Sequence, residues 1–390
     1  MAKVNMSKLE ELIQQYCPDG VEWKTLGEAT IMKRGTSATK GIMQEGDIPV
    51  ISGGRQPAFY CNVSNRTGEV ITVAGSGAGA GYVQYWNEPI FVCDAFSIQG
   101  NETLKTKYVY YILTNIQEKI YSTKKGGGVP HVHISSIDKF EIPVPPLPVQ
   151  EEIVRILDAF TELQAELQAE LQKRKQQYNY YLDNLLNFNN INRGGYQAEV
   201  RWMKLKDIGK VCMCKRILKS QTSSSGDVPF FKIGTFGGNA DAYISQALFN
   251  EYKAKYSYPQ KGEVLISAAG TIGRTIVFDG TPSYFQDSNI VWLKHDESIV
   301  LNSYLRYCYA LNPWVVSTGG TIARLYNDNI LEATIPVPSL ANQQRIVSIL
   351  DRFDTLTTDL TQGLPAEIEK RRQQYEYYRD KLLTFKRKGA

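Results

Sequence analysis

Two long amphipathic helices dominate the pattern of apolar and polar positions along the chain. The first follows prolines at 143, 145, 146 and 148, which the interior of a helix does not tolerate. Apolar residues then recur three and four positions apart, as on one face of a helix. They are Ile153, Ile156, Leu157, Phe160, Leu163, Leu167, Leu171, Tyr178, Tyr181, Leu182 and Leu185. A helix of about 40 residues is roughly 60 Å long, and its apolar stripe has to be buried against another element.

The second helix repeats this stripe and contains an interruption. The stripe comprises Ile346, Ile349, Leu350, Phe353, Leu356, Leu360, Ile368, Tyr375, Tyr378 and Leu382. Gly363 and Pro365 favour either a kink or a split that leaves Pro365 in the first turn of a second piece. We expect the two long helices to pack together as an antiparallel coiled coil, whose outer faces leave room for a partner protein.

The helices belong to an internal repeat that extends over the chain. Residues 142–160, IPVPPLPVQEEIVRILDAF, recur at 335–353 as IPVPSLANQQRIVSILDRF. Residues 173–188, KRKQQYNYYLDNLLNF, recur at 370–385 as KRRQQYEYYRDKLLTF. Shorter matches join GEVITVAGSGAGAGY (from 68) to GEVLISAAGTIGRTI (from 262), and VEWKTLGE (from 21) to VRWMKLKD (from 200). The order is a globular unit, a helix, a globular unit and a helix, and only the globular units diverge in their middles.

Each globular unit mixes strands and helices. β-Branched and aromatic residues predict extended segments at 48–52, 69–75, 90–98 and 263–270. Helices are expected at 105–122 and 301–316. The pattern does not separate parallel from antiparallel pairing. The predicted fold class is therefore α+β, with two mixed domains, two long helices and a pseudo-two-fold repeat.

Composition narrows the setting in which the chain works. Its 390 residues are enough for two domains, and a formal charge of +4 permits a nucleic-acid partner without arguing for one. The charged amino terminus is unlike a signal peptide, and no apolar run approaches the ~20 residues of a membrane span. We expect a cytoplasmic protein with no membrane contact and with its six cysteines reduced. Cys212 and Cys214 lack a nearby histidine, which argues against zinc.

The motifs that would indicate catalysis are incomplete. GSGAGAG at 75–81 lacks the third glycine and the following acid of a dinucleotide loop, and we interpret it, with GTIGR in the second unit, as a shared turn. No phosphate-binding loop is found. NPWV at 312–315 lacks the second proline of the amino-methyltransferase motif and falls in a predicted helix. With three histidines and no serine–histidine–acid set, we expect no catalytic, cofactor or metal site.

Basic residues lie in glycine-flanked loops at matched places in both units. A flexible backbone lets a guanidinium or an ammonium group reach a base edge or a phosphate, although such side chains are more often solvated surface. The DNA-contact candidates in the first unit are Lys33, Arg34, Lys40, Arg55, Lys124, Lys125 and His131, with His133 beside them. Those in the second unit are Lys215, Arg216, Lys219, Lys232, Arg274 and Arg324.

These features together resemble the DNA-specificity subunits of type I restriction–modification systems, over essentially the whole chain. The residues that carry the resemblance are 7–28, 142–160, 173–186, 335–356 and 362–385. The resemblance implies target recognition domains at 1–148 and 195–340, and spacer helices at 149–190 and 341–387. Each domain would read one half of an asymmetric, bipartite site on double-stranded DNA.

The resemblance also implies partners that supply the chemistry. Two modification (methyltransferase) subunits with S-adenosylmethionine would dock on the helices. Restriction/translocase subunits, using ATP and Mg²⁺, would complete the complex. A four-residue repeat in the first long helix is a length variable in this family, and here it matches residues 161–172 with Leu163, Leu167 and Leu171. One more unit would lengthen the helix by about 6 Å, which corresponds to one to two base pairs of added spacing on DNA. It would also rotate the helix face that follows by about 40°.

Three alternatives remain at this point. The chain could serve a methylation-only complex without a nuclease subunit. It could be a DNA adenine methyltransferase in its own right, although the motifs for that activity are missing. It could also be a coiled-coil adaptor with no role at DNA.

Overall fold

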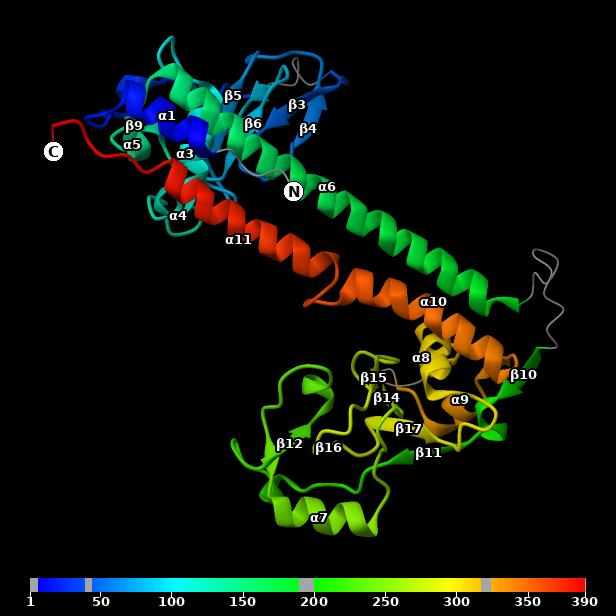
Figure 1. The fold of residues 1–390 in the computed structure, drawn as a ribbon. Helices are drawn as coiled ribbons and strands as arrows, with labels where there is room; N and C mark the ends of the chain where they lie inside the picture. The colour runs from blue at the N-terminus through cyan, green and yellow to red at the C-terminus, as the bar shows by residue number, and fades with distance from the viewer. Residues whose placement is uncertain (1–5, 39–43, 189–199, 317–323, 390) are drawn as a thin grey trace. The chain divides into compact units, whose positions relative to one another are not determined.

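The computed structural model describes residues 6–38, 44–188, 200–316 and 324–389 (Figure 1). The chain forms two compact units, of which the first contains residues 1–169 and 366–390 and the second contains residues 170–365. The long helix α6 (Leu147–Leu186) contributes to both units. Of the two helices near the carboxyl end, α10 (Leu340–Thr358) belongs to the second unit and α11 (Leu364–Leu382) to the first.

The first unit contains a globular domain made of two small sheets. A four-stranded antiparallel sheet has the order β2-β8-β5-β6, and a three-stranded sheet has the order β4-β3-β7 with a parallel β3–β7 pair. The strands are β2 (Ile31–Arg34), β3 (Ile48–Ile51), β4 (Phe59–Cys61), β5 (Val70–Ala74), β6 (Val83–Trp86), β7 (Phe91–Val92) and β8 (Ala95–Gln99). The predicted strand at 90–98 is therefore two short strands, one in each sheet.

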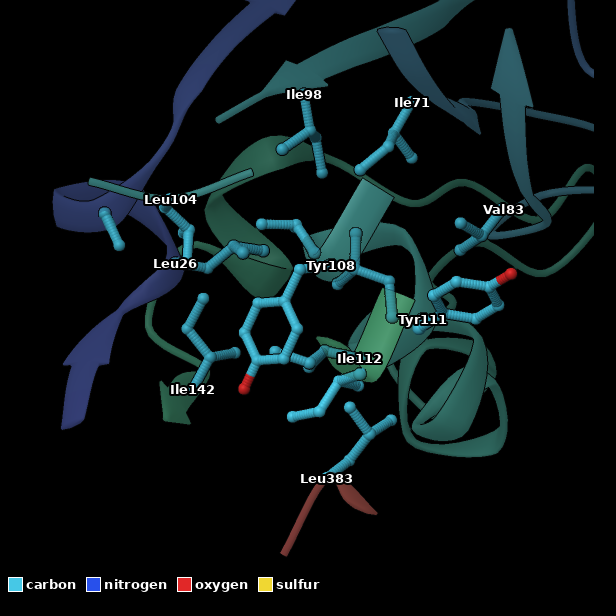
Figure 2. Close-up of a cluster of buried hydrophobic side chains, with 14 of the residues drawn as sticks. Leu26, Ile71, Val83, Ile98, Leu104, Tyr108, Tyr111, Ile112, Ile142 and Leu383 are labelled. Carbon is cyan, nitrogen blue, oxygen red and sulfur yellow. The ribbon is translucent and has the colours of Figure 1, made fainter. Parts of the chain in front are cut away.

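The core of the first unit lies between the four-stranded sheet and its helices. Ile71 and Ile98 from the sheet and Tyr108 and Tyr111 from α3 (Thr106–Asn115) lie in one buried cluster, which Leu383 joins from the end of α11 (Figure 2). Short helices complete the domain, namely α1 (Met6–Tyr16), α2 (Leu26–Ala29), α4 (Gln117–Tyr121) and α5 (Ile134–Ile137). The strand β1 (Glu22–Thr25) pairs antiparallel with β9 (Glu141–Val144), so the two ends of the domain meet just before α6 begins.

The second unit repeats this topology. Its sheets have the orders β11-β17-β14-β15 and β13-β12-β16, again with one parallel pair, β12–β16. The strands are β11 (Lys210–Met213), β12 (Val228–Phe231), β13 (Tyr243–Ile244), β14 (Val264–Ser267), β15 (Thr275–Val277), β16 (Tyr284–Phe285) and β17 (Ile290–Lys294). The helices are α7 (Gln246–Lys255), α8 (Asn302–Ala310) and α9 (Asn327–Leu331), and β10 (Arg201–Lys204) pairs with β18 (Thr334–Val337). The sequence repeat is therefore a repeat of the fold.

A buried glutamine in each unit joins the globular domain to the helix that follows it. The Gln150 amide donates to the carbonyls of Pro145 at 2.6 Å and Thr103 at 2.9 Å, and its oxygen accepts from the amide of Lys105 at 2.8 Å. Its repeat-mate Gln343 makes the same three bonds, and both side chains are 0% exposed. Each glutamine thus satisfies the backbone of the loop before α3 or α8 and fixes that loop to the first turn of a long helix.

Tyrosines from α3 and α8 make a second set of matched bonds. Tyr108 donates to the Pro143 carbonyl at 3.3 Å, and its repeat-mate Tyr304 donates to the Pro336 carbonyl at 3.0 Å. One turn later, Tyr111 donates to Asp158 and its repeat-mate Tyr307 to Asp351. Burial and the aspartate bond raise the pKa of Tyr111 above its usual range, so the hydroxyl stays a donor.

The long helices contact one another within each unit through aromatic rings. In the first unit, the ring of Phe160 stacks with that of Tyr378 on α11 at 5.5 Å between centroids. In the second unit, the ring of Phe353 on α10 stacks with that of Tyr181 at 5.1 Å. These are equivalent pairs in the sequence repeat. An extended coiled coil stays a prediction.

The predicted second spacer helix at 341–387 is split into α10 and α11, with Pro365 in the first turn of α11, where its missing N–H costs little. This split is one of the two forms that Gly363 and Pro365 predicted. Other elements differ from their predicted form. The predicted helix at 105–122 is broken at Ile116 between α3 and α4. The predicted helix at 301–316 ends at Ala310, because Asn312 has a φ of 50° and a proline follows, so NPWV lies after the helix. Within the described ranges, no helix is long and apolar enough to cross a membrane.

The glutamine bonds generate a prediction about stability. Gln150→Ala should lower the free energy of unfolding of the first unit by about 3 kcal/mol, because it removes three hydrogen bonds of a fully buried side chain and leaves the buried carbonyl of Pro145 without this partner. Gln343→Ala should do the same to the second unit. Hydrogen–deuterium exchange in urea distinguishes the two units. The exposed Gln172→Ala serves as the control, and a change below about 0.5 kcal/mol for Gln150→Ala would show that the bonds do not hold the domain to the helix.

Candidate nucleic-acid interface

A cleft of about 170 Å³ opens where several loops of the first unit converge. Arg34 lies at the end of β2, Asp94 lies in the turn between β7 and β8, and Gly75 begins the glycine-rich loop after β5. His131 and His133 close the cleft from the segment before α5. Of the first-unit candidates, the fold therefore brings Arg34 and His131 together.

The chemistry of this cleft is mixed. Asp94 accepts a hydrogen bond from the hydroxyl of Ser76, and the rings of His131 and His133 stack with 5.9 Å between centroids. Backbone hydrogen bonds between Lys125 and His131, at 2.8 and 3.0 Å, form a small hairpin that positions the first imidazole. A guanidinium, a carboxylate and two imidazoles thus offer donors and acceptors in one small space.

The second unit has a larger cleft, of about 600 Å³, at the matching strand ends. Three of the predicted cations line it, namely Arg216 and Lys219 from the segment after β11 and Lys232 from the end of β12. Asp241, Gln286, Asp287 and Asn289 lie among its other lining residues. Cations that are up to 16 positions apart in the sequence are therefore gathered into one site.

Two of the cations in this cleft are held by carboxylates. Arg216 Nε lies 2.9 Å from Asp287 Oδ2, and Lys232 Nζ lies 2.7 Å from Asp241 Oδ1. Among the described residues, no ion pair is found for Lys219. The cleft is therefore less positive than its lysines and arginine suggest.

Arg324 lies next to this cleft and has an equivalent in the first unit. Its guanidinium donates to the carbonyl of Ser288 at 3.2 Å and to Asn289 Oδ1 at 3.1 Å. Ser288 has a φ of 51°, an uncommon conformation for a residue other than glycine. The backbone N–H of Leu325, which follows Arg324, donates to the carbonyl of Ala268. In the first unit, the backbone N–H of Val132, which follows His131, donates to the carbonyl of Gly75. Arg324 and His131 thus occupy the same place in the two units.

The remaining candidates lie outside the two clefts. Lys33, Lys125 and Arg274 are exposed, and Arg274 donates to the carbonyl of Gly237 at 3.4 Å. Three cations lie over tyrosine rings: Arg55 over Tyr82, Lys124 over Tyr121 and Lys215 over Tyr256. Lys40 lies outside the described residues. DNA contact by any of these residues stays a prediction.

Sequence reasoning missed the acidic and amide groups of the clefts. Asp94 and Asp287 each follow the short strand that makes the parallel pair, in the related segments FVCDAF and YFQDSN. The shared aspartate is visible when the two repeats are aligned, but the sequence prediction considered only basic residues as DNA contacts. The glycine-rich segments after β5 and β14 lead into antiparallel neighbours, β6 and β15, so both are turns between strands, as interpreted, and no helix follows at which a phosphate could bind.

Five of the six cysteines are buried, and Cys93 is partly buried. Burial raises the pKa of the Cys214 and Cys308 thiols to about 12, so both are protonated at neutral pH. In the described part of the chain, no group of three or more histidine, cysteine or acidic side chains is placed to hold a metal ion.

Comparison with known families decides the identity of the repeat. The family described as type I restriction modification DNA specificity domain matches residues 18–194 and 197–370. Each match contains one globular domain and the helix after it. The chain belongs to this family. Membership in a family of specificity subunits, and not the absence of a motif, sets aside the alternatives of a methyltransferase and of an adaptor.

Relatives match over nearly the whole chain. A Haemophilus influenzae protein with the provisional name of a type I restriction enzyme specificity subunit is 45% identical, covering 98% of this chain and all of that protein. The Escherichia coli EcoR124I/EcoR124II specificity subunit is 32% identical, with 97% of each chain covered. This chain and these relatives therefore match over nearly their whole lengths.

Solved structures show the same fold. The type I system S subunit from M. genitalium has a TM-score of 0.61 at 17% identity, covering 93% of this chain and 95% of that one. A chain from a study of complex assembly in the type I system has a TM-score of 0.56 at 19% identity, covering 94% and 98%. The predicted α+β fold with two repeated domains is confirmed.

Proposed function

We propose that each globular domain of this specificity subunit reads one half of a bipartite, asymmetric site on double-stranded DNA. The helices would set the distance between the half-sites and hold two modification subunits. S-adenosylmethionine would belong to those subunits, and ATP and Mg²⁺ to restriction/translocase subunits of the complete complex. The catalysis would then take place in the partners, while this chain chooses the sequence.

One observation carries this proposal: the two units share one topology but present different groups at the same strand ends. The first cleft offers Arg34, Asp94 and two histidines, and the second offers Arg216, Lys219 and neighbouring amides. Bases are distinguished in the major groove by their patterns of donors and acceptors. Identical frames with unlike clefts are therefore suited to two unlike half-sites.

The groups in the clefts match base edges. Arginine and lysine bond to the acceptors of guanine, and asparagine and glutamine fit the edge of adenine. The exposed cations outside the clefts, such as Lys33 and Lys125, are suited to phosphates, which position a protein on DNA without reading its sequence.

The four-residue repeat lies at the boundary between the units. Helix α6 continues without a break through residues 161–172, and the division between the units falls after Ala169, inside the repeat. Leu163 and Leu167 are half-buried and Leu171 is buried. A change in the number of repeats would therefore change the helix between the two domains and leave both domains intact.

The helices present a duplicated surface for a partner. Tyr180 and Tyr377 are repeat-mates, and their side chains are 63% and 62% exposed. Six positions earlier in each helix, Arg174 bonds to a glutamate and a glutamine of its own helix, and Arg371 makes the equivalent two bonds. Two equal surfaces fit two copies of one protein, the modification subunit.

Insertion of one further AELQ after Gln172 should lengthen the gap between the half-sites by about one to two base pairs and leave both half-site sequences unchanged. Sequencing of methylated sites in cells that contain the partner subunits measures this directly. Replacing the four residues 165–168 by their own sequence in altered codons is the control. An unchanged gap would contradict the spacing role of the helix.

Exchange of residues 200–334 for those of another family member should change one half-site alone, because this segment contains the second cleft and none of the first. Methylation mapping again gives the result. A change in both half-sites would show that the domains do not read independently.

The double substitution Tyr180→Ser and Tyr377→Ser should weaken binding of the modification subunits at least tenfold, as expected for loss of exposed aromatic anchors. Each single substitution should leave one of the two subunits bound tightly. Native mass spectrometry counts the bound subunits. The exposed Tyr326→Ser, in the second globular domain, is the control, and full binding by the double variant would place the partner elsewhere.

A further inference from the structure

We propose that Asp241 and Asp287 determine specificity by exclusion: they hold Lys232 and Arg216 and thereby weaken binding of the second cleft to DNA of the wrong sequence. This inference rests on the proposed function, since it concerns how the second domain discriminates between sequences. In this cleft the acidic residues, and not the cations alone, would determine which DNA sequences bind.

The arrangement of charges leads to this assignment. Three cationic side chains and two carboxylates line the cleft. The Asp287 side chain is only 19% exposed while that of Arg216 is 68% exposed, so the carboxylate is set into the wall and the guanidinium lies at the mouth. Asp241 and Lys232 form a similar pair at 2.7 Å near the rim, with side chains 57% and 41% exposed. Of the three cations, two are already partnered before DNA arrives.

Partnered cations affect non-cognate and cognate DNA differently. Binding to non-cognate DNA depends almost entirely on neutralising phosphates and releasing counterions. A phosphate that approaches Arg216 or Lys232 meets a carboxylate competing for the same cation, and it is repelled by that carboxylate. A cognate half-site adds directed hydrogen bonds between its bases and Lys219, Gln286 and Asn289, which these two carboxylates do not hold. The carboxylates therefore lower non-cognate affinity more than cognate affinity, which raises the ratio between them.

The first unit gives independent support. Asp94 occupies the same turn, after the short strand of the parallel pair, as Asp287 does in the second. Its partner is the Ser76 hydroxyl, so the carboxylate charge remains in a cleft that also contains Arg34. A carboxylate recurs at this place although the rest of the two clefts differs.

The test uses the full chain bound to its modification subunits. Fluorescence anisotropy measures binding to a short random-sequence duplex over a series of NaCl concentrations, for Asp287→Asn, Asp241→Asn and the double variant. Each substitution should tighten binding by roughly threefold and steepen the slope of log K against log salt by about 0.9, the value for one added phosphate contact. Methylation of the cognate site should persist, with more methylation at related sequences.

Two matched variants separate charge from structure. Asp287→Glu keeps the carboxylate and should bind the random duplex as the native chain does. Asp207→Asn removes an exposed carboxylate of the same unit that does not line the cleft, and should leave the slope unchanged. Thermal unfolding of each variant confirms that the fold is retained.

Two results would overturn the inference. Unchanged affinity and slope in the double variant, with cognate methylation intact, would show that the carboxylates do not screen the cleft. Lost cognate methylation without tighter random-duplex binding would make them direct readers of a base. A native complex that neither binds duplex DNA nor methylates it would instead refute the proposed function itself.

Discussion

The buried amides of Gln150 and Gln343 are the constraint on which the arrangement of each unit depends. Each glutamine lies in the first turn of a long helix and bonds to the backbone on both sides of a loop in the preceding domain. Three hydrogen bonds with fixed directions, made by a side chain that is 0% exposed, hold the domain on the first turn of its helix. The bonds from Tyr111 to Asp158 and from Tyr307 to Asp351 connect each domain to the same helix a second time.

This constraint explains how the two clefts could diverge while the frame stayed the same. The bonds that fix the domain come from the start of α3 or α8 and from the proline-containing strand, and none of the residues that make them lines a cleft. Loops that end at the clefts contribute little to these bonds. They are therefore free to vary in residue type, as the contrast between His131 and Arg324 at one equivalent position shows. A reader of DNA with exchangeable specificity needs this separation between the supporting frame and the reading groups.

Much of the fold could be predicted from sequence because its signals are local or duplicated. The apolar stripes predicted the helices α6 and α10. The runs of β-branched residues at 69–75 and 263–270 predicted the strands β5 and β14. The ends of helices were harder to predict, because the break at Ile116 and the end at Ala310 depend on single backbone conformations. The clefts were harder still. Arg216 and Asp287 are 71 positions apart, and only the tertiary fold brings them within 2.9 Å. The basic residues in loops therefore gave candidates for DNA contact, but not which cations converge in a cleft or which are held by carboxylates.

The proposed function requires two unlike readers in one frame to specify a divided target. Base-resolution mapping of methylation, in cells that contain this chain and its modification subunits, shows the target itself. We expect one asymmetric motif made of two different half-sites, separated by a gap of fixed length in which the bases do not matter. A continuous motif, or a palindrome with two identical halves, would contradict it.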